Sequence, residues 1–189
     1  MTLLADGPER TDLLLHVCCA PDATHGVAAF GKRFDVIGFF YNPNIHPREE
    51  FRKRLFAALD LQGKRPFPLV IGIGGEESWE EAVQGLEGEP ERGRRCEACV
   101  RLRLRETARK ASELGMPAFG TVLTVSPKKD SAMVNRVGRE EGKRAGVRYV
   151  EADLKKEDGF LNSVRATREL GIYRQRYCGC RHSGGGMSP

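Results

Sequence analysis

The stretch LLLHVCCAPDATHGVAAFGKRFDVIGFFY, residues 13–41, decides the fold. It contains two short apolar runs, Leu13 to Val17 and Val36 to Tyr41, and each is continuous, as in a strand buried on both faces. Between them, Thr24 to Lys32 has the apolar spacing of a helix. A strand, a helix and a second strand in this order predict a unit with two parallel strands.

The rest of the chain repeats this alternation. Further strands are expected at 67–73, 118–125 and 147–152, and further helices at 47–62, 99–114 and 131–145. The pattern predicts a three-layer, Rossmann-like α/β domain with a parallel sheet of about five strands. We expect one domain over residues 1–183 and a disordered tail over residues 184–189, which begins with three glycines.

In such a sheet, ligands bind beyond the carboxyl ends of the strands. Nucleotide-binding members of this architecture carry a glycine-rich loop after the first strand. Here Cys18 and Cys19 occupy that place, and Gly26 is the only nearby glycine. The glycines of residues 72–75 are typical of a plain turn. An ATP-dependent enzyme that modifies or thiolates tRNA would need the missing loop, so the sequence argues against that class.

Composition describes a soluble globular protein. The chain has 189 residues, 40% of them hydrophobic and 30% charged, with a formal net charge of +5. It has no run of about 18 apolar residues, so no membrane association is expected. The first twelve residues are too polar and acidic for a signal peptide, and we expect a cytoplasmic protein.

All six cysteines occur in tight pairs: Cys18–Cys19, Cys96–Cys99 and Cys178–Cys180. In the cytosol, paired cysteines favour metal binding or redox chemistry over structural disulfides. Arginines surround the second and third pairs, at positions 92, 94, 95, 101, 103, 105, 174, 176 and 181. Such positive charge would stabilise thiolates and attract a polyanion such as nucleic acid.

The first two pairs together offer four thiolates. Cys96 and Cys99 are three residues apart at a predicted helix start, which places both sulfur atoms on one face. With Cys18 and Cys19 they match the usual ligand set of a 4Fe-4S cluster, and equally that of a four-cysteine zinc site. Adjacent cysteines can bind one metal only where the chain is irregular, and Pro21 favours such a loop.

The third pair differs, because Cys178 and Cys180 flank a single glycine. Residues two apart in an extended segment lie near the upper limit of disulfide reach. Gly179 permits unusual dihedral angles, so a strained, reducible bridge could form. Two further metal ligands are the alternative.

Several polar residues follow the predicted strands. Asp22 could bind a second metal, handle protons or act as a helix N-cap. His16 lies within the first strand and is typical of a core histidine. Lys128 and Lys129 follow the fourth strand and could contact phosphate or belong to a solvated loop.

The chain resembles the epoxyqueuosine reductases of the QueH type. The resemblance runs from Leu14 to Ser183 and rests on segments that occur in the family's order. They are His16 to Pro21, Tyr41 to Pro47, Arg95 to Leu104, Thr107–Ala108, Leu123 to Lys128, Asp158 to Phe160, and Tyr173 to Gln175 through Tyr177 to Cys180. The segment Gly72 to Trp79 departs from the acidic, aromatic run of the family.

The resemblance implies the last step of queuosine synthesis. In that step, two electrons remove the epoxide oxygen of epoxyqueuosine in the anticodon loop of tRNA. It implies a 4Fe-4S cluster on Cys18, Cys19, Cys96 and Cys99, and a redox-active pair at Cys178 and Cys180. An additional iron or other divalent metal at Asp22 is an attractive role for that residue.

No nicotinamide, flavin or cobalamin motif occurs in the sequence, so an external electron donor is expected. The arginines would hold anticodon-stem phosphates, while the modified base is splayed out to reach the site. The rival hypothesis is a zinc-stabilised RNA-binding module without catalysis, which needs neither Cys178 nor Cys180.

Overall fold

Five parallel strands form one sheet, in the order β3-β2-β1-β4-β5. The structure is a computed structural model and describes residues 10–183. The strands are β1 (Thr11–His16), β2 (Phe34–Phe40), β3 (Leu69–Ile71), β4 (Ala118–Thr121) and β5 (Arg148–Tyr149). This confirms the predicted α/β class and the number of strands. The predicted tail, 184–189, lies outside the described residues.

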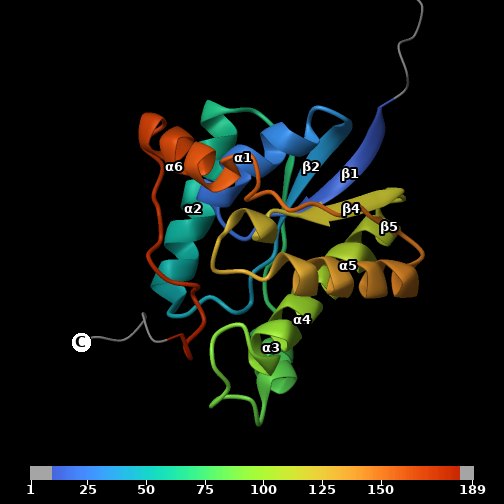
Figure 1. Cartoon of the computed structure of the whole chain (residues 1–189), viewed down its shortest axis with the longest axis vertical. Coiled ribbons are helices and arrows are strands. Elements are labelled where there is room, and N and C mark those ends of the chain that lie inside the picture. The colour runs from blue at the N-terminus through green and yellow to red at the C-terminus, as the bar shows by residue number, and fades with distance from the viewer. Residues whose placement is uncertain (1–9, 184–189) are drawn as a thin grey trace, which may run out of the picture.

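Helices cover both faces of the sheet (Figure 1). They are α1 (Ala20–Phe30), α2 (Arg48–Lys64), α3 (Glu76–Val83), α4 (Arg94–Glu113), α5 (Ser131–Ala145) and α6 (Gly159–Glu169), with a 3₁₀ turn η1 (Leu123–Val125). Leu14 of β1 packs in one core with residues of α4 and α5. Leu13 and Leu15 point to the other face, in a core that includes Phe30 of α1. The alternation of side chains along β1 thus divides the three layers.

The order of the strands creates a switch point beside β1. The chain leaves β1 for β2 and β3 on one side, and returns for β4 and β5 on the other. Leu14 is therefore paired with Ile37 of β2 and with Phe119 of β4. The carboxyl ends of β1 and β4 open at this point, which is where an open α/β sheet binds ligands.

Two helices begin earlier than the sequence predicts. α1 starts at Ala20, with Cys19 as N-cap and a proline in its first turn, rather than at Thr24. Asp22 therefore lies inside the first turn, and the N-cap interpretation of this residue is wrong. α4 starts at Arg94 rather than at Cys99, so both of its cysteines are helical. The predicted bounds of α5 are confirmed.

Past α6, the chain runs back alongside α2 toward the carboxyl edge of the sheet (Figure 1). This last described segment, residues 170–183, contains Cys178 and Cys180. None of the helices in the described part of the chain is long and apolar enough to cross a bilayer.

Candidate metal and redox site

A cavity of about 470 Å³ lies beyond the carboxyl ends of β1 and β4. Five of the six cysteines line it: Cys18, Cys19, Cys96, Cys178 and Cys180. The sixth, Cys99, is buried and packs in a small core with Trp79, Leu102 and Cys180. The fold therefore joins all three cysteine pairs at one place, as the sequence predicts.

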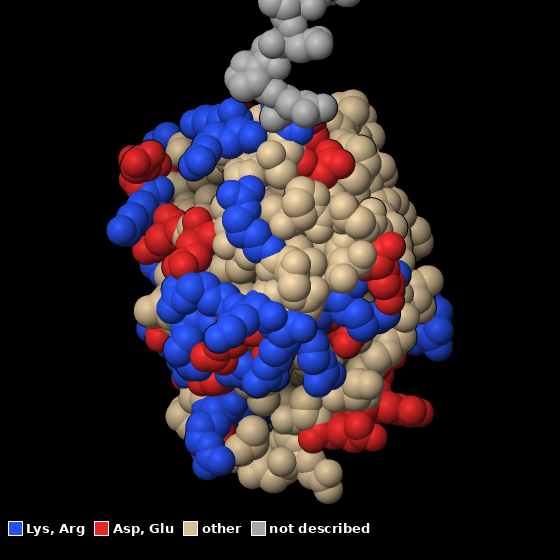
Figure 2. Space-filling view, turned by 90° about the vertical axis from the view of Figure 1, so that its right-hand side faces the viewer, with Lys and Arg blue, Asp and Glu red and all other residues tan. Residues whose placement is uncertain are grey.

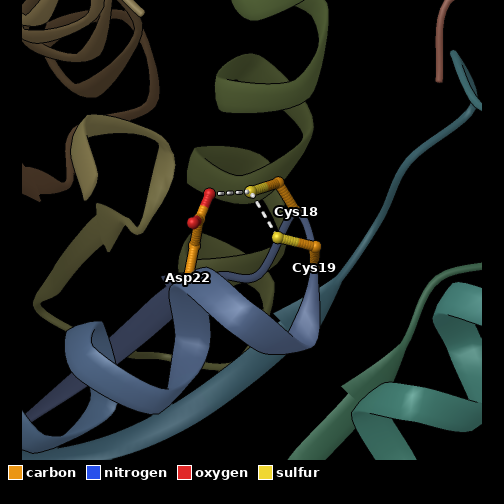
Figure 3. A group of neighbouring side chains, drawn as sticks. All are labelled: Cys18, Cys19 and Asp22. Carbon is orange, nitrogen blue, oxygen red and sulfur yellow. Dashed lines mark hydrogen bonds between the residues drawn. The ribbon is translucent and has the colours of Figure 1, made fainter. Parts of the chain in front are cut away.

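Cys18, Cys19 and Asp22 form the closest group (Figure 3). The chain bends at Cys18 directly after β1, and Cys19 is extended (φ −166°, ψ 159°) as it caps α1. This irregular backbone brings the two sulfur atoms to 3.8 Å, although the residues are adjacent. The Cys18 thiol donates to Asp22 Oδ2 at 3.4 Å. One ligand atom from each of the three residues lies within 4.8 Å of the others.

The pKa shifts of Cys18 and Asp22 are those expected of ligands that face a cation site. The hydrogen bond with Cys19 and burial raise the pKa of Cys18 well above its ordinary value. Burial raises the pKa of Asp22 to about 6, against hydrogen bonds from both thiols. Burial thus disfavours the charged forms of the Cys18 thiol and the Asp22 carboxyl, and a bound cation would favour them. Soft thiolates beside a carboxylate fit iron or zinc.

Cys96 and Cys99 lie in the first two turns of α4, which begins after Gly93. The Cys96 sulfur accepts the Arg92 N–H at 3.3 Å and faces the cavity. Burial raises the pKa of Cys99. These two sulfur atoms do not join the tight group of Cys18, Cys19 and Asp22. The structure thus places all four predicted cluster ligands around one site without drawing them into a single cage.

Cys178 and Cys180 are free thiols in this structure. Lys129 Nζ donates to the Cys178 sulfur at 3.2 Å. Burial raises the pKa of Cys178, but the positive charges of Lys129 and Arg103 outweigh it, so the pKa lies below its ordinary value. The pKa of Cys180 lies above its ordinary value, because burial raises it. The pair therefore consists of one thiol that ionises readily and one that does not.

Arg54 of α2 holds the backbone of this pair. Its two terminal nitrogens donate to the carbonyl oxygens of Cys178 and Tyr177, at 2.9 and 3.0 Å. Its Nε donates to Glu50, in an ion pair whose side chains are only 3% and 8% exposed. Gly179 has φ +96°, and a side chain there would crowd Arg54 Nη1 at 2.9 Å. The glycine between the cysteines is thus required by both conformation and space.

Arg103 lies beneath the cysteines, where α4 passes the centre of the sheet. It is buried and donates to Asn42 Oδ1 and Asn44 Oδ1, each at 3.2 Å. Burial lowers the pKa of Arg103, but the surrounding thiols, Cys99 and Cys18 first among them, raise it overall. A fixed positive charge at this point stabilises any anionic form of the site.

Sequence reasoning missed the contacts of Arg54 and Lys129, whereas Arg103 is one of the arginines expected to stabilise thiolates. Arg103 had a signal, since it follows Cys96 by seven residues and Cys99 by four, on the same helical face. Lys129 was expected to contact phosphate or solvent, and it contacts Cys178 instead. Arg54 had none for its contacts with Cys178 and Tyr177, because these residues lie more than 120 positions away. His16 is a core residue as predicted, fully buried between Thr121 and the Tyr41 carbonyl.

The structure is that of a parallel α/β protein with thiols and a carboxylate gathered at the carboxyl edge of its sheet. The chain belongs to the epoxyqueuosine reductase QueH family, whose family model matches residues 13–185.

Relatives in several bacteria support this membership. An epoxyqueuosine reductase QueH of Streptococcus pyogenes serotype M1 is 38% identical over 90% of this chain and 69% of its own length. The protein of the same name from Staphylococcus epidermidis is 36% identical over 91% and 76%. That of Thermotoga maritima is 36% identical over 89% and 88%.

Proposed function

We propose that this chain is an epoxyqueuosine reductase, which converts epoxyqueuosine in the anticodon loop of tRNA to queuosine. The reaction breaks both C–O bonds of an epoxide and forms a C=C bond. It consumes two electrons and two protons, and it releases the oxygen as water. The observation that carries the proposal is the joining of three distant cysteine pairs at one cavity in a member of this family.

Cys18, Cys19, Cys96 and Cys99 are the proposed ligands of a 4Fe-4S cluster, and Asp22 that of an additional iron or other divalent metal. The donor set fits, because buried thiols and one carboxylate converge there with a buried arginine below them. When bound, these groups supply single-electron transfer and a Lewis acid for the epoxide oxygen.

Cys178 and Cys180 are the proposed source of the electron pair. Oxidation of the two thiols to a disulfide releases two electrons and two protons, which balances the reduction of the epoxide. The proximity of Lys129 to Cys178 supports this role, since it favours the reactive thiolate. An external electron donor then restores the dithiol. We place the enzyme in the cytoplasm, where thiols stay reduced.

The distribution of charge supports binding of tRNA at the cavity. Figure 2 shows lysine and arginine side chains gathered in a band across the side that carries α5 and β5, with acidic side chains among them. Arg101 of α4 is neutralised by Glu97, Glu140 and Glu141, and Arg136 of α5 by Glu97 and Glu140. Within the described residues, seven cations that line the cavity have no carboxylate partner, and they are Arg92, Arg95, Arg103, Lys128, Lys129, Arg174 and Arg176. Three of these are exposed: Arg92, Lys128 and Arg176. These are the charges free to meet phosphate.

The decisive experiment is anaerobic purification with iron and sulfide analysis, followed by incubation with tRNA that carries epoxyqueuosine and a chemical reductant. Nucleoside mass spectrometry should show queuosine with the wild-type chain, and none with Cys178→Ser or Cys180→Ser. Absence of queuosine from wild-type protein with an intact cluster would contradict the proposal. A colourless, zinc-loaded protein in which both serine variants bind RNA normally would favour a non-catalytic RNA-binding module.

Asp22 is tested separately by metal content. Asp22→Asn should lower the iron bound per chain without removing the sulfide. Asp60→Asn is the matched control, since Asp60 forms an exposed ion pair with Lys64. Equal iron content in both variants would remove Asp22 from the metal site.

A further inference from the structure

Buried polar atoms without a partner gather at the cavity. Among the described residues, seven buried side-chain nitrogen or oxygen atoms have no hydrogen-bond partner within the protein. Five of them belong to residues that line this cavity: Asn44, Arg95, Arg103, Arg174 and Gln175. Such an atom costs about 1–3 kcal/mol unless something satisfies it. Their concentration therefore indicates a ligand with its own donors and acceptors.

Arg174 and Gln175 stand out in this set. The other two arginines are held through their remaining nitrogens, Arg95 by backbone carbonyls and Arg103 by asparagines. Arg174 Nη1 and Gln175 Oε1 are both buried and have no hydrogen-bond partner among the described residues. Neither residue is needed to hold the fold through its polar atoms, so both are available to a ligand.

Arg174 is nevertheless fixed in place. Its guanidinium lies over the ring of Phe160 in α6, with its carbon 5.1 Å from the ring centroid. Phe160 also lines the cavity. Asp22, the proposed ligand of the additional metal, lines the same cavity. The orphan nitrogen therefore belongs to a held side chain that lies near the proposed metal site.

The two orphan atoms have complementary chemistry. Arginine only donates hydrogen bonds, and Gln175 Oε1 only accepts them. A guanine-type base presents a carbonyl oxygen at C6 next to N–H groups at N1 and C2. An arginine often binds guanine through O6 and N7 together. The base of queuosine carries carbon at position 7, so only O6 remains, which matches the one buried and unpartnered nitrogen of Arg174, Nη1.

We propose that Arg174 and Gln175 read the edge of a guanine-type base extruded into the cavity. Arg174 donates to the C6 carbonyl oxygen, and Gln175 accepts from the N–H groups at N1 and C2. This inference rests on the proposed function in one respect, namely that an RNA base enters the cavity. It adds the residues that select the base and the atoms by which they do so.

The test is a binding measurement on the metal-loaded full chain, with anticodon stem-loop RNAs that differ only at the target base. The three RNAs carry guanine, inosine without the C2 amino group, or 2-aminopurine without the C6 oxygen and the N1–H. Wild-type protein should bind the guanine RNA about tenfold more tightly than the inosine RNA, as one lost base contact predicts, and should bind the 2-aminopurine RNA more weakly still. No difference among the three RNAs would overturn the inference.

The variants assign each contact. Arg174→Met should reduce the preference for guanine over 2-aminopurine and leave the preference over inosine intact, and Arg174→Lys, which keeps a donor, should restore part of the loss. Gln175→Leu should abolish the preference for guanine over inosine. Arg176→Met is the control, because this exposed arginine lines the same cavity two residues away. It should weaken all three RNAs equally.

Two outcomes contradict the assignment. Equal weakening of all three RNAs by Arg174→Met, with a smaller salt dependence, would make Arg174 a phosphate contact. Equal weakening of the binding of all three RNAs by Gln175→Leu would contradict a base-reading role of Gln175. Loss of queuosine formation with the base preference intact would instead contradict only the proposed reductase activity, so the two proposals fail separately.

Discussion

The side chain of Arg54 links helix α2 to the segment that carries the third cysteine pair. Its guanidinium joins a buried glutamate of its own helix to two carbonyl groups of the segment that carries the third cysteine pair. Glu50 also accepts a hydrogen bond from Tyr173, at 2.8 Å. The position of Cys178 thus depends on a polar network that satisfies every member, as buried charges require.

Arg54→Met should lower the free energy of unfolding by about 3–5 kcal/mol, because it leaves Glu50 buried without its cation. Urea denaturation followed by circular dichroism measures this. Arg52→Met, on the exposed side of the same helix, should change it by less than about 0.5 kcal/mol. A similar decrease in the free energy of unfolding in both variants would show that the Arg54 network contributes little to stability.

Lys129→Met should slow the alkylation of Cys178 by iodoacetamide at pH 7 in the reduced, metal-free protein. Removing the ammonium group takes away the charge that lowers the pKa of this thiol, so less thiolate is present. Peptide mass spectrometry over time measures the rate at each cysteine. Lys128→Met is the control, since Lys128 is exposed and should leave the rate unchanged.

At the scale of elements, sequence patterns predicted the buried strands better than the ends of helices. Continuous apolar runs identified β1 and β2 because both faces of these strands are covered. The starts of α1 and α4 were missed because cysteine and glycine cap them without a side-chain hydrogen bond, so the usual N-cap signature is absent. α3 and α6 were not anticipated, and each follows a residue with positive φ.

The candidate site was only partly predictable for a related reason. The cysteine pairs and Asp22 follow strands or begin a helix, and their meeting follows from the sheet order. Two contacts depend on the path of residues 170–183. Lys129 contacts the Cys178 sulfur, and Arg54 contacts the carbonyl groups of Tyr177 and Cys178. That path has no regular structure and therefore no periodic signal.

Gly138→Ala should destabilise the protein, because a methyl group in α5 would overlap the ring of Tyr149. That ring packs on Phe119 and hydrogen-bonds Asn135, so it cannot move aside freely. Overpacking costs about 1–3 kcal/mol and outweighs the gain in helix propensity. Gly63→Ala in α2 meets no atom within 4 Å and should instead stabilise by about 0.5–1 kcal/mol. Thermal unfolding compares the two variants, and a shift of the same sign in both would contradict the packing argument.

At the scale of the molecule, one end of the sheet carries the whole site. Binding of tRNA should weaken steeply with salt, since it releases counterions from phosphates. Lys128→Met should lower the slope of log K against log salt by about 1, as one lost phosphate contact predicts. Arg139→Met should leave the slope unchanged, because Arg139 of α5 is paired with Glu151. Equal slopes for wild-type protein and Lys128→Met would place the RNA elsewhere.

The amino end of β1 and the cavity lie at opposite edges of the sheet. Six residues of strand at about 3.3 Å each separate them by roughly 20 Å. The last described segment, in contrast, forms part of the cavity wall with Cys178 and Cys180. Tethering the protein to an electrode near Asp12 would therefore leave the thiols facing the solution, whereas tethering beyond Ser183 would crowd the entrance. The direction of the parallel strands thus determines at which end the protein should be attached to an electrode for voltammetry.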